Sequence, residues 1–270
     1  MRRLLLWAIA LCVLLIALLL EVRARRAARG PETCRGSDER VGPDTMTVRP
    51  SSFRVLVFTK HQEYSHRSIP AAVAAMHTLG ARHGFTVLAT DDANLFVDDA
   101  LRAFAAVIFL NTTGNILSEQ QKAAVERYVH AGGGVVGIHS ALDTESGWAW
   151  YHRLLGADFA NHPPVQRARL IVSSAAEGRS PRLPQPWERT DEWYNYRALP
   201  ENVNVLVSVD EESYRGGTMG RSHPVSWSHD FEGGRAWYTA MGHTTCTYSE
   251  GPFLDQVLSG IRYAAKESLP

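Results

Sequence analysis

The chain has 270 residues, 45% of them hydrophobic, and its formal net charge is zero when histidine is neutral. This length and apolar content suffice for a sizeable core, and the balanced charge gives no electrostatic case for a nucleic-acid partner. The basic excess is confined to the first 40 residues, which hold eight arginines against four acids.

An uninterrupted apolar run begins near the N-terminus. Seventeen apolar residues, Leu4 to Leu20, follow Arg2 and Arg3. A membrane-spanning helix needs about 17–25 apolar residues, whereas the apolar core of a cleaved signal peptide has about 7–15. Residues 1–22 are therefore predicted to be a membrane anchor, with a signal peptide as the alternative.

Residues 23–50 are rich in Arg, Gly, Pro and acids and show no apolar periodicity, which predicts a disordered linker. We expect the globular domain that follows to be anchored outside the cytoplasm, in the periplasm or at the cell surface. If the first segment is cleaved, the domain would instead be secreted.

Strands and helices alternate in the first half of the globular domain, which is expected to span residues 51–268. The Ser68-Ile69-Pro70 and Ser118-Glu119-Gln120-Gln121 signals each predict a helix start. Runs of β-branched and aromatic residues predict strands at 53–59, 85–89, 105–110 and 135–138. The alternation predicts an α/β protein with a doubly wound parallel sheet, a flavodoxin-like three-layer sandwich.

The second half has a different pattern. A short helix is predicted at 148–155 and a closing amphipathic helix at 252–266. Strand-like segments between them cover 166–173, 190–197, 203–209, 224–229 and 234–240. Because no long helix separates these segments, we expect a mixed or antiparallel extension of the sheet.

Polar residues follow three of the predicted parallel strands. His66 follows the first strand, Asn111 and Thr113 follow the third, and His139 and Asp143 follow the fourth. Open parallel sheets bind ligands at the carboxyl ends of their strands, so these residues are predicted to converge on a crevice. Many hydrolases carry a nucleophile in the turn that His139 occupies, but the G-x-S-x-G pattern is missing around Ser140.

Five of the eleven histidines lie at predicted strand ends or in turns bounded by Gly or Pro: His66, His139, His162, His223 and His243. Histidine exchanges protons near neutrality and binds metals, so several at converging strand ends favour a functional site over structural roles. Asp143 could orient an imidazole, bind a sugar hydroxyl, share a metal or cap a helix. Glu145 is expected to favour a helix N-terminus.

The segment Thr190-Asp191-Glu192-Trp193-Tyr194 combines acids with aromatic rings. Aromatic faces stack on sugars and carboxylates accept hydroxyl protons, so Glu192 is a candidate acid or base, and Trp193 and Tyr194 are candidate sugar contacts. The alternative is an edge strand whose aromatic residues fill a core.

No cofactor motif is present. The three cysteines show no metal spacing, and no H-E-x-x-H pattern occurs. A divalent metal remains an alternative to proton transfer, and its ligands would have to be assembled across loops, from His139, Glu192 and His243.

Four strings resemble the ThuA-like (trehalose utilisation) family: residues 109–114, 132–141, 190–194 and 233–244. The resemblance covers about residues 53–266 and implies a class I glutamine amidotransferase-like fold. In the amidotransferases a catalytic cysteine occupies the turn where this chain has His139. The only cysteine of the globular part, Cys246, lies elsewhere, so the amidotransferase reaction is not expected.

The resemblance implies a role in sugar metabolism, on disaccharides or on 3-keto derivatives made by a partner sugar 3-dehydrogenase. The leading hypothesis is a hydrolase or lyase/isomerase in which His139 and Glu192 exchange protons at the sugar and His66 and His243 assist. The predicted substrate-binding residues are Asn111, Thr113, Asp143, His162, Trp193, Tyr194 and His223. The alternatives are a non-catalytic, membrane-anchored carbohydrate-binding domain and an amidase-type hydrolase that uses Cys246 or Ser140.

Overall fold

The computed structural model describes residues 52–173, 183–198 and 201–267. The predicted anchor (1–22) and linker (23–50) lie outside the described residues. Within the described ranges, no helix combines the length and the apolar content that crossing a membrane requires.

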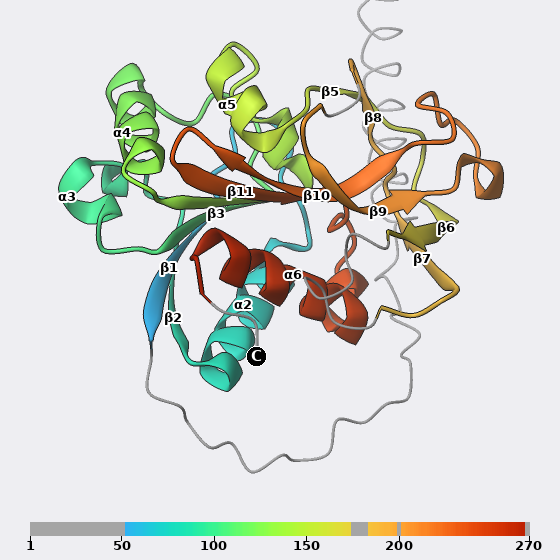
Figure 1. Cartoon of the computed structure of the whole chain (residues 1–270), viewed down its shortest axis with the longest axis horizontal. Helices are drawn as coiled ribbons and strands as arrows, with labels where there is room; N and C mark the ends of the chain where they lie inside the picture. The colour runs from blue at the N-terminus through green and yellow to red at the C-terminus, as the bar shows by residue number, and fades with distance from the viewer. Residues whose placement is uncertain (1–51, 174–182, 199–200, 268–270) are drawn as a thin grey trace, which may run out of the picture. The chain divides into compact units, whose positions relative to one another are not determined.

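One large sheet organises the described part of the chain (Figure 1). Its first five strands are parallel, in the order β2 (Phe85–Thr90), β1 (Phe53–Phe58), β3 (Ala106–Leu110), β4 (Gly134–Ile138) and β11 (Gly234–Thr239). Antiparallel strands extend it, in the order β10 (Pro224–Phe231), β9 (Asn204–Val209), β6 (Gln166–Val172) and β7 (Trp187–Asp191). The mixed extension predicted for the second half is thus present.

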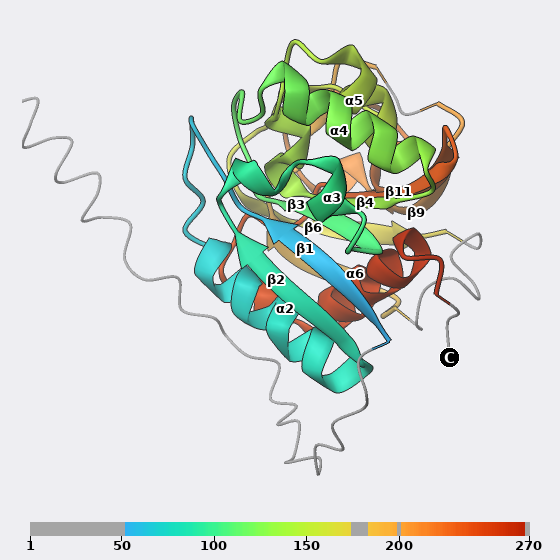
Figure 2. The same ribbon diagram turned by 90° about the vertical axis from the view of Figure 1, so that its left-hand side faces the viewer.

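Helices cover both faces of the parallel part of the sheet (Figure 2). On one face lie α2 (Ile69–His83) and α6 (Gly251–Ala264), and on the other lie α3 (Asp98–Leu101), α4 (Glu119–His130) and α5 (Ala149–Leu155). Short 3₁₀ turns occur at Ala93–Leu95, His139–Asp143 (η2), Glu211–Ser213 and Cys246–Ser249. This arrangement confirms the predicted three-layer α/β sandwich.

The core forms where the sheet is covered on both faces. Every residue of β3 and β4 is buried, and Phe58 and Phe109 pack edge to face below the strand ends, with ring centres 6.0 Å apart. Each fully buried side chain of this size contributes roughly 1.5–3 kcal/mol relative to an exposed one. The strand ends that carry the polar residues are therefore held in place by a well-packed core.

The two predicted helix starts behave differently. Ser118 and Gln121 form the predicted capping box, each bonding the other's backbone amide. Ser68 precedes α2, but its side chain makes no cap bond; its hydroxyl donates to the carbonyl oxygen of Gly242, 3.2 Å away. The start of α2 is thereby tied to the loop after β11.

The predicted strand at 190–197 was wrong as a continuous element. β7 ends at Asp191, and a separate short strand, β8 (Asn195–Tyr196), pairs with β5 (Phe159–Asn161). The break occurs where the Asp191 carboxylate accepts the Glu192 amide at 3.0 Å, a local bond that replaces the ladder. Residues 192–194 are consequently free of the sheet.

Candidate functional site

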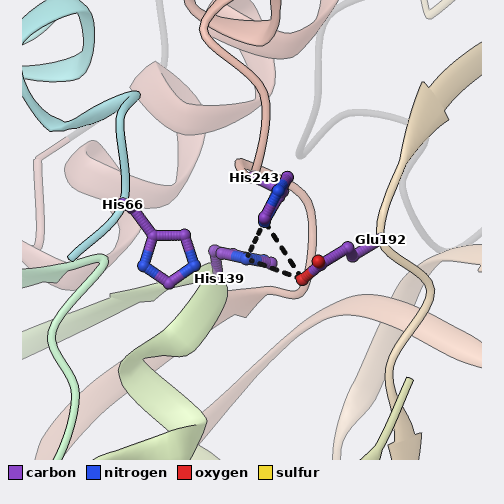
Figure 3. Close-up of side chains that lie close together, drawn as sticks. All are labelled: His66, His139, Glu192 and His243. Atoms are coloured by element: carbon purple, nitrogen blue, oxygen red, sulfur yellow. Dashed lines mark hydrogen bonds and ion pairs between the residues drawn. The ribbon is translucent and has the colours of Figure 1, made fainter. Parts of the chain in front are cut away.

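Four ionisable side chains meet at the ends of strands that are far apart in sequence (Figure 3). His66 lies in the loop after β1, His139 directly follows β4, Glu192 directly follows β7, and His243 follows β11. One ligand atom from each of the four lies within 4.8 Å of the others. The structure thus brings together all four residues predicted to be catalytic, and we call them the His–Glu cluster.

His139 is the buried centre of the cluster. Its backbone φ of 54° is in the left-handed region, which turns the chain sharply from β4 into η2. Its Nδ1 lies 2.7 Å from the carbonyl oxygen of Ala240. Its Nε2 lies 3.1 Å from the Tyr194 hydroxyl, 3.3 Å from His243 Nδ1 and 3.4 Å from Glu192 Oε2.

Glu192 faces two histidines with the same oxygen. Its Oε2 is 3.1 Å from His243 Nδ1 and 3.4 Å from His139 Nε2. Burial alone would raise the pKa of Glu192, but hydrogen bonds from His139 and His243 outweigh it and hold the pKa below its usual range. Glu192 is therefore an ionised acceptor at neutral pH.

His66 is neutral at physiological pH. Burial, reinforced by the nearby His139 and His243, lowers the pKa of His66 to about 2. Its Nδ1 is 3.3 Å from the Ser140 hydroxyl, and its ring packs edge to face on that of His139. Ser140 is thus placed as a partner that orients His66.

A buried ion pair holds the His243 loop in place. Asp191 accepts the backbone amides of Gly242 and His243, each at 3.0 Å, and pairs with Arg189 at 3.0 Å. Sequence reasoning missed both charges. The available signal was their spacing, since residues two apart on a strand share one face, and here that face is buried.

Gly242 permits the close approach of this loop to His139. Its φ is 131°, and a Cβ at this position would lie 2.8 Å from the Tyr248 hydroxyl oxygen and 3.3 Å from the Cβ of His139. A larger residue would therefore push the His243 loop away from β4.

Three of the predicted substrate-binding residues lie at or near the cluster. Tyr194 contacts His139, and His162 Nδ1 lies 3.6 Å from Glu192 Oε1 with 36% of its side chain exposed. Asp143 is partly buried, and burial followed by repulsion from Glu63 raises its pKa. These groups are suited to contact a ligand that reaches the cluster from solvent.

Asn111 and Thr113 are buried, and their side chains are already hydrogen-bonded. Asn111 Nδ2 donates to Ser68 Oγ at 2.9 Å and to the Gly242 oxygen at 3.1 Å, and its Oδ1 accepts the Tyr248 hydroxyl. The hydroxyl of Thr113 donates to the carbonyl oxygen of Tyr64. Both residues therefore hold loops around the site, in place of the sugar contacts expected of them.

Trp193 and His223 are buried, and their side chains hold backbone segments next to the site. Trp193 is fully buried, and its indole donates to the Gln166 carbonyl oxygen at 2.9 Å. His223 Nε2 donates to the carbonyl oxygen of Tyr194 at 2.8 Å, while its Nδ1 contacts Glu211. His223 thus fixes the backbone that presents Tyr194, although burial, opposed by these bonds, lowers the pKa of His223.

Glu145 has a structural place, but not the helix-end place that we expected. Its Oε1 accepts the amides of Ile116 and Leu117 at 2.7 Å, and its Oε2 pairs with Lys122 at 2.9 Å. It anchors the loop after β3, because the buried carboxylate satisfies two amides that the loop leaves unpaired.

Tyr64 is a residue of the site's rim that sequence reasoning did not select. Its ring packs edge to face on His66, with ring centres 4.7 Å apart, and the residue is 48% exposed. An exposed ring beside ionisable groups offers a stacking face to a sugar. Its only signal in the sequence was its place in the polar loop before His66.

The donor set determines the chemistry that the cluster can perform. Three imidazoles and one carboxylate can transfer protons or hold a divalent metal ion. None of the four is a hydroxyl or thiol nucleophile. The arrangement therefore suits acid–base or metal-assisted reactions and gives no support to an amidase-type mechanism through Ser140.

A family model described as ThuA, trehalose utilisation, matches residues 54–264. A ThuA-like protein from Bacteroides uniformis superposes with a TM-score of 0.68 at 22% identity, over 80% of this chain and 92% of that one. One from Parabacteroides merdae gives 0.66 at 19% identity, over 82% and 92%. A comparison with curated proteins found no match. At these identities the structural likeness shows the fold alone.

Proposed function

Because the chain belongs to the ThuA (trehalose utilisation) family, whose name gives it a carbohydrate-related role, we propose that it is an enzyme that cleaves disaccharides in their 3-keto form. The His–Glu cluster is the proposed reaction centre. The observation that carries the proposal is the convergence of four ionisable side chains at the strand ends without a nucleophile among them.

An oxidised sugar can be cleaved without a nucleophile. A 3-keto group acidifies the hydrogen on C2, so a base can remove that proton. The electron pair then forms a C1–C2 double bond, the C1–O glycosidic bond breaks, and the departing oxygen takes a proton from an acid. Addition of water to the double bond completes a net hydrolysis, and no oxidant or reductant is consumed.

The surroundings of the cluster supply the remaining requirements. The four groups share the proton transfers and the stabilisation of the negative charge that develops on the keto oxygen. Tyr64 and His162 offer aromatic faces at the exposed side, and Asp143 offers a hydroxyl acceptor. The keto sugar itself would come from a sugar 3-dehydrogenase, the partner that this chemistry requires.

The test is turnover of a 3-keto-disaccharide by the purified chain, with release of the free monosaccharide followed by chromatography. We expect cleavage of the keto sugar and none of the unoxidised disaccharide, because only the keto group acidifies C2–H. His139→Gln and Glu192→Gln should each lower kcat by at least about 100-fold. His130→Ala, at the exposed end of α4, is the matched control and should retain the wild-type rate.

Two results would contradict this proposal. Equal rates for the His139→Gln variant and the wild type would show that the reaction occurs elsewhere. Saturable binding of the keto sugar without any product would instead support a carbohydrate-binding domain, for which the exposed Tyr64 ring would be the main contact.

A further inference from the structure

Three atoms of the His–Glu cluster form a nearly regular triangle (Figure 3). His243 Nδ1 is 3.1 Å from Glu192 Oε2, His243 Nδ1 is 3.3 Å from His139 Nε2, and His139 Nε2 is 3.4 Å from Glu192 Oε2. A tetrahedral ion with bonds of about 2.0–2.1 Å spaces its ligand atoms by about 3.3–3.4 Å. The triangle therefore has the dimensions of one face of a metal coordination shell.

One tautomer of His139 leaves this triangle short of hydrogen-bond donors. The Ala240 carbonyl oxygen can only accept, so at 2.7 Å the His139 Nδ1 must carry a proton, and a ring that carries this proton alone presents a lone pair at Nε2. The ionised Glu192 is also only an acceptor. In that tautomer two acceptors lie 3.4 Å apart in a buried site, and the donors near them are the Tyr194 hydroxyl, 3.1 Å from His139 Nε2, and His243 Nδ1, 3.1 Å from Glu192 Oε2. A divalent cation would satisfy both acceptors at once.

The supports of the triangle are those that metal-binding histidines need. The Ala240 oxygen fixes the tautomer and the ring orientation of His139, and Asp191 fixes the backbone of His243. The Ala240 oxygen belongs to the backbone and Asp191 belongs to a buried ion pair, so the ligand atoms are held in place before any ion binds.

We propose that His139 Nε2, His243 Nδ1 and Glu192 Oε2 bind one divalent metal ion. Two imidazoles, one carboxylate and no thiolate suit Zn²⁺, and three protein ligands leave a position open for a substrate oxygen. His66 is outside the triangle in this assignment, because its Nδ1 is engaged by the Ser140 hydroxyl at 3.3 Å, although one of its ring nitrogens lies within 4.8 Å of the other three ligand atoms.

The metal site also assigns different roles to the members of the cluster in the cleavage of the sugar, and these roles rest on the proposed function. The ion would bind the keto oxygen of the sugar and draw electron density from it, which makes the hydrogen on C2 more acidic. His66 is then the cluster member left to contact the sugar directly. Metal binding itself can be measured without any sugar.

The test is metal binding by the full chain after treatment with a chelator. Titration with Zn²⁺ should show one equivalent bound, and Co²⁺ at the same site should give the intense visible absorption of a four-coordinate ion. His139→Ala, His243→Ala and Glu192→Gln should each weaken Zn²⁺ binding by at least about 100-fold, whereas His66→Gln should change it less than about threefold.

His130 and Glu232 provide a matched control. They form a histidine–carboxylate pair 2.7 Å apart on the surface, and the His–Glu cluster is the one group of three or more converging ligands in the described part of the chain. His130→Ala should leave binding unchanged. Circular dichroism of the isosteric Glu192→Gln variant would show that its loss of binding is not a loss of fold.

The outcomes separate the two proposals. Failure to bind one equivalent of Zn²⁺, or equal affinity in the three ligand variants and the wild type, would overturn the metal site. A 100-fold loss in His66→Gln would overturn the three-ligand assignment. Full turnover of the keto sugar in excess chelator would contradict the metal's role in the reaction and leave the proposed cleavage of the keto sugar intact. Binding of one equivalent of Zn²⁺ without any turnover would support the metal site and contradict the proposed cleavage.

Discussion

The backbone of His139 is in the strained left-handed conformation, and this conformation directs its imidazole toward the other members of the His–Glu cluster. A residue with a Cβ pays about 1–2 kcal/mol to adopt the left-handed conformation, which the φ of 54° requires. The turn resembles the strained nucleophile turn of hydrolases, but the side chain it presents is a proton carrier or a ligand. Strain of this kind is retained where it positions a functional group.

This strain predicts an unequal response to substitution at position 139. Asparagine tolerates the left-handed region, whereas valine is stiff and branched at Cβ. His139→Val should therefore unfold at a lower urea concentration than His139→Asn, with a difference in unfolding free energy of about 1–2 kcal/mol. Equal unfolding free energies for the two variants would show that the conformation carries no strain.

Residue types and local positions were enough to select the members of the His–Glu cluster. Its three histidines follow strands that the apolar pattern marks, and Glu192 was selected as an acid among aromatic residues. Residue types and local positions were not enough to assign roles to Asn111 and Trp193. Both are polar or amphipathic residues near strand ends, but tertiary hydrogen bonds to Ser68 and to Gln166 occupy them. A partner that is distant in sequence has no local signal.

At the scale of elements, the parallel half was predictable and the antiparallel half only in part. Strands β1 to β4 are continuous apolar runs bounded by helix caps, and both signals are local. β7 and β8 were merged in the prediction because the β-formers Thr190, Trp193, Tyr194 and Tyr196 span the segment. The Asp191 carboxylate at the break accepts the neighbouring amide of Glu192 and the distant amides of residues 242 and 243, and no local pattern shows the distant contacts.

The end of β7 should be the most sensitive point of the antiparallel half. Asp191→Asn removes the carboxylate charge nearest the buried Arg189 and leaves it with Glu250 at 3.6 Å, and breaking a buried pair costs about 3–5 kcal/mol. Glu188→Gln on the same strand breaks the exposed pair with Arg167 and should cost less than about 1 kcal/mol. Urea denaturation measures both.

A second measurement separates stability from placement. In Asp191→Asn the loop that carries His243 loses a charge-assisted anchor, so the Zn²⁺ affinity should fall even at low temperature, where the variant is folded. Similar losses of unfolding free energy in the Asp191 and Glu188 variants would contradict the structural role given to Asp191.

At the scale of the whole molecule, acid should destabilise the fold through buried histidines. His229, on β10, donates from Nε2 to the Leu154 oxygen, and burial, only partly opposed by this bond and by Asp230, lowers its pKa. The unfolded chain therefore binds a proton below about pH 6.5 while the folded chain does not. Stability from this group is present above that pH and falls as the pH is lowered.

The predicted slope is at most about 1.4 kcal/mol per pH unit for one histidine, and it ends at the folded-state pKa. Urea unfolding at several pH values below 6.5 measures it. His229→Gln keeps a donor toward Leu154 but does not titrate, so its stability should fall less steeply than that of the wild type. Parallel curves for the two proteins would contradict the assignment.

The four members of the His–Glu cluster are spread between positions 66 and 243, so the site is closed only by a late segment of the chain. A ribosome delivers the chain from its N-terminus, and β1, β3 and β4 emerge with His66 and His139 long before His243. Until then the cluster lacks His243, which pairs with Glu192 in the folded chain. The complete His–Glu cluster can therefore form only after β11, which lies between β4 and β10 in the sheet, has been synthesised.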